Sequence, residues 1–187
     1  MMRNPAFLAI LLLLAGCSSS DSGLLGDIHW HADIKVYLNG EQLNLSHERY
    51  MSTEEHTLSN FAHLHDGNGN IVHKHASGIT LGFFFQTLGI GLNSSCLTLD
   101  NGTNYCTNEA ETLKFYVNGK QNSQFDSYDF KDEDRILITY GRDSEQIIKS
   151  QMDSVTEEAC IYSLTCPERG SPPDEASCVG DCKAEGG

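Results

Sequence analysis

Residues 61–76 read FAHLHDGNGNIVHKHA and contain two His-x-His pairs, His63/His65 and His73/His75, on either side of an Asp, Gly and Asn run. Such a run between two segments predicts a β-hairpin. Side chains on a strand alternate between its faces, so both histidines of a pair point the same way. With His65 opposite His73, His63 falls opposite His75 and all four imidazoles share one face. A slip of one residue would separate the pairs.

A third pair, His29/His31, lies in the segment 28–38, which reads IHWHADIKVYL. Its even positions are apolar and most of its odd positions are polar, which predicts a half-buried strand with the histidines on the polar face. Asn39-Gly40 follows and predicts a tight hairpin turn into a second strand over residues 41–46. The histidine pairs therefore lie on predicted strands.

A short helix is predicted after the histidine hairpin. Thr80 is a suitable N-cap, the helix LGFFFQTL follows, and Gly89 ends it. Its phenylalanines are expected in the core. Residues 91–111 are rich in Gly, Asn, Ser and Cys and are predicted to form a loop.

Two more strands are expected, LKFYV before the second Asn-Gly turn at Asn118 and RILITYG over residues 135–141. The order of hairpin, helix and two strands predicts an α+β fold with a mixed sheet. It resembles the β-grasp, or ubiquitin-like, fold over residues 27–142, with the histidine hairpin as an addition. The sulfur-carrier activity of some β-grasp proteins is not implied, because a long tail follows Gly141.

The remaining segment, 143–187, is predicted to hold a helix and a disulfide-stapled tail. Asp143 or Ser144 is a suitable N-cap for an amphipathic helix that extends to about Glu158. A Pro- and Cys-rich stretch follows, in which disulfides would replace the core that so short a segment cannot build.

The N-terminus resembles a bacterial lipoprotein signal. Arg3 precedes an apolar run that ends in Leu-Ala-Gly-Cys, too short for a spanning helix. The resemblance implies removal of residues 1–16, a lipid on Cys17 and a flexible tether over residues 17–26. It places the protein in the cell envelope, in the outer membrane if the cell is Gram-negative.

Net charge limits the partners. The full chain has a formal charge of −14, and removal of Arg3 with the signal would make it −15. Such a surface repels nucleic acid and anionic lipid and favours cations. A nucleic-acid-binding function is therefore excluded.

Six cysteines remain beside Cys17, an even number that suits an oxidising compartment and three disulfides. Their spacing suggests local pairs, although other connectivities are open. The suggested pairs are Cys96 with Cys106, Cys160 with Cys166, and Cys178 with Cys182. No Cys-x-x-Cys motif is present, which disfavours a thiol-redox enzyme.

Six of the eight histidines thus lie in three His-x-His pairs on strands. Neutral imidazole is the commonest metal ligand, and two imidazoles on one strand face can chelate one ion. Imidazole donors suit divalent ions such as Cu(II) and Zn(II). Asp33 and Asp66 are candidates to orient a ligand or to bind directly. The predicted metal ligands are His29, His31, His63, His65, His73 and His75.

The motifs also resemble a little-characterised family of exported prokaryotic proteins over residues 28–141. Its features are a His-x-His strand ending in Asn-Gly, a His-x-His-Asp motif, and Thr-Leu-Gly-x-Phe-Phe, here Thr80 to Phe85. The resemblance places five histidines on family motif positions but implies no established activity. Those histidines are His29, His31, His63, His65 and His73.

Three function classes follow from these observations. The favoured one is an envelope lipoprotein that sequesters or delivers a divalent transition metal. The second is a metal-dependent hydrolase or oxidoreductase with three histidine ligands and an open position for water. The third is a structural or interaction protein of the cell surface. No nucleophile constellation accompanies the histidines, which favours binding over catalysis.

Overall fold

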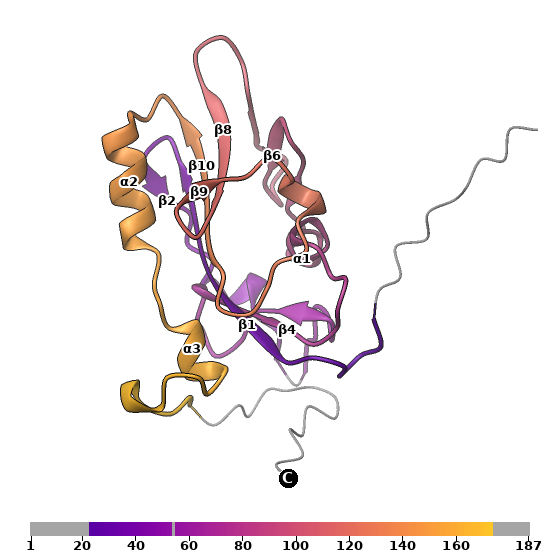
Figure 1. The fold of residues 1–187 in the computed structure, drawn as a ribbon. Coiled ribbons are helices and arrows are strands. Elements are labelled where there is room, and N and C mark those ends of the chain that lie inside the picture. The colour runs from indigo at the N-terminus through magenta and orange to yellow at the C-terminus, as the bar shows by residue number, and fades with distance from the viewer. Residues whose placement is uncertain (1–22, 54, 174–187) are drawn as a thin grey trace, which may run out of the picture.

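The computed structural model describes residues 23–53 and 55–173. They form a seven-stranded mixed sheet centred on β1 (Trp30–Leu38) and β10 (Arg135–Gly141), the only parallel pair within it. The strand order is β3-β4-β1-β10-β8-β9, and β2 also pairs with β1. Figure 1 shows these two long strands running through the middle of the molecule.

The outer strands are antiparallel to their neighbours. Asn-Gly turns join β1 to β2 and β8 to β9. Asn39, Gly40, Asn118 and Gly119 all have positive φ, as such turns require. The predicted second strand is short and ends at Gln42. The bounds are β2 (Glu41–Gln42), β3 (Ala62–His63), β4 (Ile71–Lys74), β8 (Thr112–Val117) and β9 (Lys120–Gln121).

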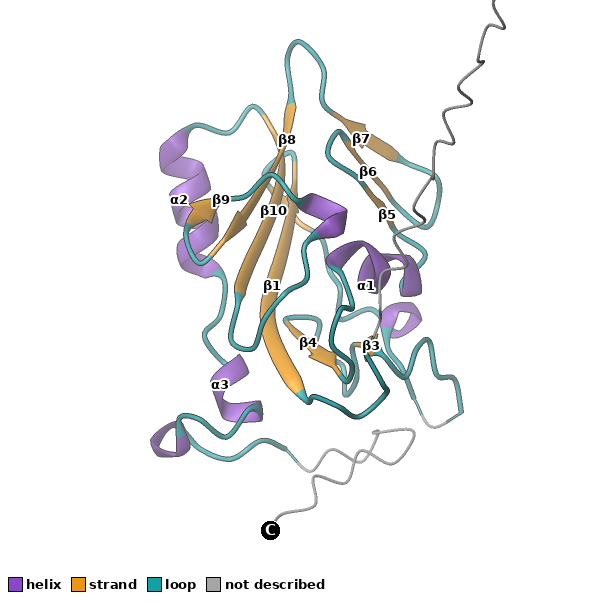
Figure 2. Cartoon of the chain, turned by 45° about the vertical axis from the view of Figure 1, so that its right-hand side comes forward, coloured by secondary structure: helices purple, strands orange, loops and turns teal. Residues whose placement is uncertain are grey.

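The predicted loop over residues 91–111 is wrong in part, because the chain there forms a second antiparallel sheet. It consists of β5 (Gly91–Leu92), β6 (Cys96–Thr98) and β7 (Asn104–Cys106), seen beside α1 in Figure 2. Cys96 and Cys106 lie directly opposite each other and form the predicted disulfide. The disulfide joins two paired strands and does not close an irregular loop.

Helix α1 (Leu81–Thr87) covers one face of the large sheet. Thr80 caps it as predicted by accepting a hydrogen bond from the Phe83 amide, and Gly89 follows it with a positive φ. Phe84 and Phe85 are fully buried against the apolar, even-numbered side chains of β1. The main core therefore lies between α1 and this sheet face.

Helices α2 (Glu145–Ser154) and α3 (Ala159–Tyr162) lie on the opposite side of the sheet from α1 (Figures 1 and 2). Ser144 caps α2, and Ile148 and Met152 pack against Leu137. The predicted single helix to Glu158 is wrong at its end, because the chain becomes extended at Val155 and starts again as α3. The short 3₁₀ helices are η1 (Glu48–Tyr50), η2 (Phe125–Ser127) and η3 (Pro167–Arg169).

A lysine is fully buried in the core face of β4. Lys74 forms an ion pair with Asp129 and donates to the Phe130 carbonyl at 2.8 Å. Its ammonium also lies 5.1 Å from the Trp30 ring centroid. Burial lowers the pKa of Lys74, and the Asp129 carboxylate opposes that effect. Because side chains alternate, Lys74 and its two histidine neighbours point to opposite faces.

The α+β class, the mixed sheet and two of the three expected disulfides are present, the second being Cys160–Cys166. The β-grasp assignment stays a prediction. Residues 1–16, Cys17, Cys178 and Cys182 lie outside the described residues. Within residues 23–53 and 55–173, no helix has the length and apolar character needed to cross a membrane.

Candidate metal centre

Three adjacent strands bring the three His-x-His pairs to one face of the large sheet. Strand β4 lies between β3 and β1, and His73 is directly opposite both His63 and His31. The predicted hairpin register, with His65 opposite His73, is therefore wrong by two residues. His65 lies instead at the start of the turn, where its carbonyl accepts a hydrogen bond from the Asn68 amide at 3.0 Å.

A shift of two residues leaves every side chain on the same face of the sheet, so the histidines of the two hairpin pairs still share one face, as predicted. The first-strand pair joins the hairpin pairs directly, because β1 and β4 are hydrogen-bonded neighbours. We call the resulting set of six side chains the histidine face: His29, His31, His63, His65, His73 and His75.

Five of these histidines are buried, with exposed fractions of 1–2 %, and His29 is half-buried. The other two histidines of the chain, His47 and His56, are exposed. Burial of a polar ring is costly unless it has a hydrogen-bond partner or a bound ion. The concentration of buried imidazoles thus separates the histidine face from ordinary surface histidines.

Three members of the histidine face come closest to a metal-binding geometry. One potential donor atom from each of His29, His31 and His73 lies within 4.8 Å of the other two. The ring centroids of His29 and His31 are 4.6 Å apart, and those of His31 and His73 are 4.7 Å apart. Three imidazoles in this arrangement suit a divalent transition metal.

A hydrogen-bond chain fixes the tautomer of His31. The Ser163 hydroxyl donates to Asp132 Oδ1 at 2.6 Å, so its oxygen accepts from His31 Nδ1–H at 2.9 Å. The same Asp132 oxygen accepts from the His31 backbone amide at 2.9 Å. With the proton on Nδ1, Nε2 is the nitrogen through which His31 would bind a metal.

The same tautomer follows for His63 and His65. His63 Nδ1 lies 2.8 Å from the Ser59 carbonyl oxygen, and His65 Nδ1 lies 2.7 Å from Asp66 Oδ2. Both oxygens only accept, so each Nδ1 must carry its proton. Asp66 thus contacts the ring of His65, which is the contact needed to orient a ligand, one of the two roles predicted for it.

Helix α3 covers the histidine face. The Tyr162 ring centroid lies 5.6 Å from that of His31 and 5.5 Å from that of His73, and its hydroxyl accepts from Asn68 Nδ2 at 3.0 Å. The Cys160–Cys166 disulfide spans Tyr162 and Ser163. The cover is therefore joined both to the hairpin turn and, through Ser163, to a histidine.

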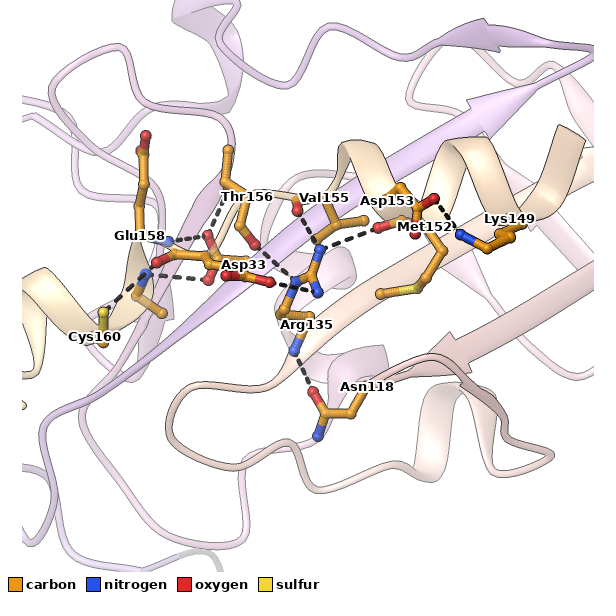
Figure 3. Close-up of polar contacts among 12 residues, drawn as sticks. Asp33, Asn118, Arg135, Lys149, Met152, Asp153, Val155, Thr156, Glu158 and Cys160 are labelled. Atoms are coloured by element: carbon orange, nitrogen blue, oxygen red, sulfur yellow. Dashed lines mark hydrogen bonds and ion pairs between the residues drawn. The ribbon is translucent and has the colours of Figure 1, made fainter. Parts of the chain in front are cut away.

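Asp33, the other predicted orienting carboxylate, holds this cover in place. Its carboxylate accepts hydrogen bonds from the Thr156 hydroxyl and from the amides of Glu158 and Ala159, as Figure 3 shows. The Asp33 carboxylate therefore contacts the beginning of α3. Arg135 donates to the Met152, Val155 and Thr156 carbonyls and fixes the link between α2 and α3.

Burial is the main reason that the pKa of His73 falls well below its ordinary value. The neighbouring rings of His65, His31, His63 and His75 lower it further, because a charge on one would repel a charge on the next. His73 is therefore neutral at physiological pH. Neutral imidazole is the form that binds metal.

The comparisons with known proteins give no further guide. No protein-family model, curated protein or solved structure matches this chain. What the structure establishes is a three-histidine cluster, His29, His31 and His73, that is compatible with metal binding. Ser163, Asp132 and Tyr162 were not predicted as parts of the site, since they are ordinary residue types in segments distant from the histidines.

Proposed function

We propose that this protein is an envelope lipoprotein that binds a divalent transition metal through the histidine face, for sequestration or delivery. The observation that carries the proposal is the cluster of donor atoms from His29, His31 and His73 within 4.8 Å. The Nδ1 hydrogen bonds of the histidine face support it, because ligand histidines commonly donate the proton of the other ring nitrogen to an oxygen.

Cu(II) and Zn(II) are the favoured ions. Both bind imidazole nitrogen well, and Cu(II) stands highest in the usual order of affinity for such donors. The paired cysteines near the histidine face, Cys160 and Cys166, form a disulfide and offer no thiolate. The donor set is thus one of imidazole nitrogens with carboxylates nearby.

The cellular location rests on the sequence. The Leu-Ala-Gly-Cys motif supports lipid attachment at Cys17, which would place the histidines outside the cytoplasm. The two disulfides agree with an oxidising compartment. An extracytoplasmic protein with buried imidazoles is suited to hold metal in the envelope.

The test is metal analysis of the full chain, purified from the producing cells without a polyhistidine tag. Stoichiometric metal, or tight Cu(II) uptake with a nitrogen-rich electron paramagnetic resonance spectrum, is expected. The variant His31→Ala/His73→Ala should bind the ion of the His29, His31 and His73 cluster about 100-fold more weakly or worse, a larger loss than a change in a supporting residue would cause.

The matched control is His47→Ala/His56→Ala, which removes the two exposed histidines and should bind like the wild type. Circular dichroism establishes that each variant is folded. Equal loss of binding in both double variants, or weak and non-saturating uptake by the wild type, would refute the proposal.

A further inference from the structure

The six rings of the histidine face form a closed circuit, and this arrangement exceeds what one ion needs. Neighbouring ring centroids along the circuit are 3.9–5.5 Å apart. The order around it is His29, His31, His73, His65, His63, His75 and back to His29. Because a tetrahedral site takes at most four protein ligands, six imidazoles supply donors for more than one ion.

The circuit divides into two arcs of three rings. His29, His31 and His73 form the first arc, whose donor atoms are already clustered. The second arc is the remaining trio, His65, His63 and His75. In it, the His65 and His63 centroids are 5.5 Å apart, and those of His63 and His75 are 5.1 Å apart.

The second arc contains ligand nitrogens with a defined tautomer. His63 and His65 both carry their proton on Nδ1, donated to the Ser59 carbonyl and to Asp66, so both offer the Nε2 lone pair. Within the described part of the chain, the buried His65 Nε2 has no hydrogen-bond partner. A buried acceptor in that state is costly, and a bound cation removes the cost.

The two arcs also differ in the groups that support them. On the first arc, Ser163 and Asp132 hold His31 from the side of α3. On the second arc, the backbone before β3 and the turn residue Asp66 hold His63 and His65. Each arc thus has its own oxygen acceptors and a carboxylate that would offset part of the charge of an ion.

We propose that His63, His65 and His75 bind a second divalent transition-metal ion beside the ion at His29, His31 and His73. The proposal deepens the function proposed above and rests on it for its metal chemistry. His63 and His65 chelate the ion as a His-x-His pair, and His75 is the third donor. Side-chain rotations would bring the three nitrogens together, since among the described residues only the first arc has donor atoms within 4.8 Å of one another.

The test is the number of ions per chain, measured on the full chain by titration with Zn(II) and by elemental analysis after removal of excess metal. Two ions per wild-type chain are expected. The variant His29→Ala/His31→Ala should keep one ion at the second arc, and the matched variant His63→Ala/His65→Ala should keep one at the first.

Loading the wild type with Cu(II) gives a readout that needs no substitution. Two ions within one circuit of rings should show a dipole-coupled paramagnetic resonance spectrum with a half-field signal, and this signal should disappear in both double variants. The half-field signal of the wild type shows whether two ions are bound close together, even if a variant fails to fold.

The outcomes separate the two proposals. One uncoupled ion, lost in His29→Ala/His31→Ala and kept in His63→Ala/His65→Ala, would overturn the second site and leave the proposed function intact. One ion lost in either variant would mean a single site that spans both arcs, which also overturns the proposal. A wild type that binds no ion would refute the proposed function itself.

Discussion

At the scale of single residues, Nδ1 hydrogen bonds determine which nitrogen His31, His63 and His65 offer to a metal. His31 donates to Ser163, whose own proton goes to Asp132, so three residues from distant segments set one tautomer. The Ser163 hydroxyl lies between the His31 ring and the Asp132 carboxylate. It orients the ring and keeps the carboxylate charge one residue away from the metal. Ser163 is thus a positioning residue for His31.

We expect Ser163→Ala to weaken metal binding about 10- to 100-fold, because His31 loses the acceptor that orients its ring. Competition with a chromophoric chelator measures the affinity. The matched control is Thr165→Ala, whose hydroxyl lies in the same disulfide loop and donates to Glu133. An affinity for Ser163→Ala equal to that of Thr165→Ala would show that the chain to Asp132 does not position a ligand.

The metal-free protein should lose stability on acidification, because of His73. Its pKa is well below 6.5 in the folded chain and near 6.5 in the unfolded chain, so the unfolded state binds the proton more readily. The stabilisation is complete above pH 6.5 and falls by up to about 1.4 kcal/mol per pH unit below it. The rings of His31, His63, His65 and His75 face His73 and oppose its protonation.

Urea unfolding of the chelator-treated protein at pH 7.5 and pH 5.5 measures this dependence. The free energy of unfolding should be lower at pH 5.5, and His73→Asn should show a smaller difference between the two values. A wild type equally stable at both pH values would contradict the assignment of a neutral, buried His73.

The candidate ligands themselves could be predicted from sequence, because strand alternation and turn residues are local signals. The supporting residues could not. Ser163 and His31 are 132 positions apart, and no periodicity connects them. The contacts of Asp33 could not be predicted either: it lies two residues after His31 and was a candidate to orient a ligand or bind directly, and in the structure its carboxylate accepts hydrogen bonds from the Glu158 and Ala159 amides.

At the scale of elements, α3 acts as a cover over the histidine face. It is only Ala159–Tyr162 in length, too short to be stable alone, and it depends on Asp33 and on the Cys160–Cys166 disulfide. The Cys160–Cys166 disulfide therefore helps to hold Tyr162 and Ser163 in place, and its reduction would loosen both residues.

Removal of this disulfide by Cys160→Ala/Cys166→Ala should weaken metal binding as well as stability. Closing so short a loop contributes about 2 kcal/mol in the chain-entropy account, and here that loop carries the groups that contact His31 and His73. The control, Cys96→Ala/Cys106→Ala, removes a disulfide from the small sheet, which is separate from the sheet that carries the histidine face. Thermal unfolding and metal titration compare the two.

The control variant should lose stability but keep the wild-type metal affinity. If both variants lose stability and neither loses affinity, α3 does not order the site.

Among the elements, those with local signals were predicted well. Thr80 caps the start of α1 and Gly89 follows its end, and two Asn-Gly pairs form the β1–β2 and β8–β9 turns. The hairpin register was missed because β3 ends at His63. The next two residues, which the pattern had assigned to the strand, lie beyond its end. The small sheet was missed because its strands are two or three residues long, below the length at which alternation is visible.

At the scale of the whole molecule, a chain with a formal charge of −14 carries six imidazoles on one sheet face, five of them buried. The long-range field of the acidic surface attracts divalent cations and raises their local concentration, more so at low ionic strength. The lipid expected on Cys17 would hold this acidic domain at a membrane.

Anchoring is tested by Cys17→Ala in a cell that supports lipoprotein processing. The wild type should incorporate labelled fatty acid and sediment with membranes, while the variant should do neither, because the acylated thiol is absent. Ser18→Ala keeps the cysteine and is the control. Incorporation of label by Cys17→Ala would place the lipid elsewhere or refute the lipoprotein assignment.

The most direct measurement of the central claim is X-ray absorption spectroscopy of the full chain loaded with Zn(II) or Cu(II). We expect a first shell dominated by at least three nitrogen neighbours at about 2.0–2.1 Å, with the outer-shell scattering that imidazole rings produce. A shell of oxygen alone, or of sulfur, without imidazole scattering would show that the metal lies elsewhere and would contradict the histidine face as its site.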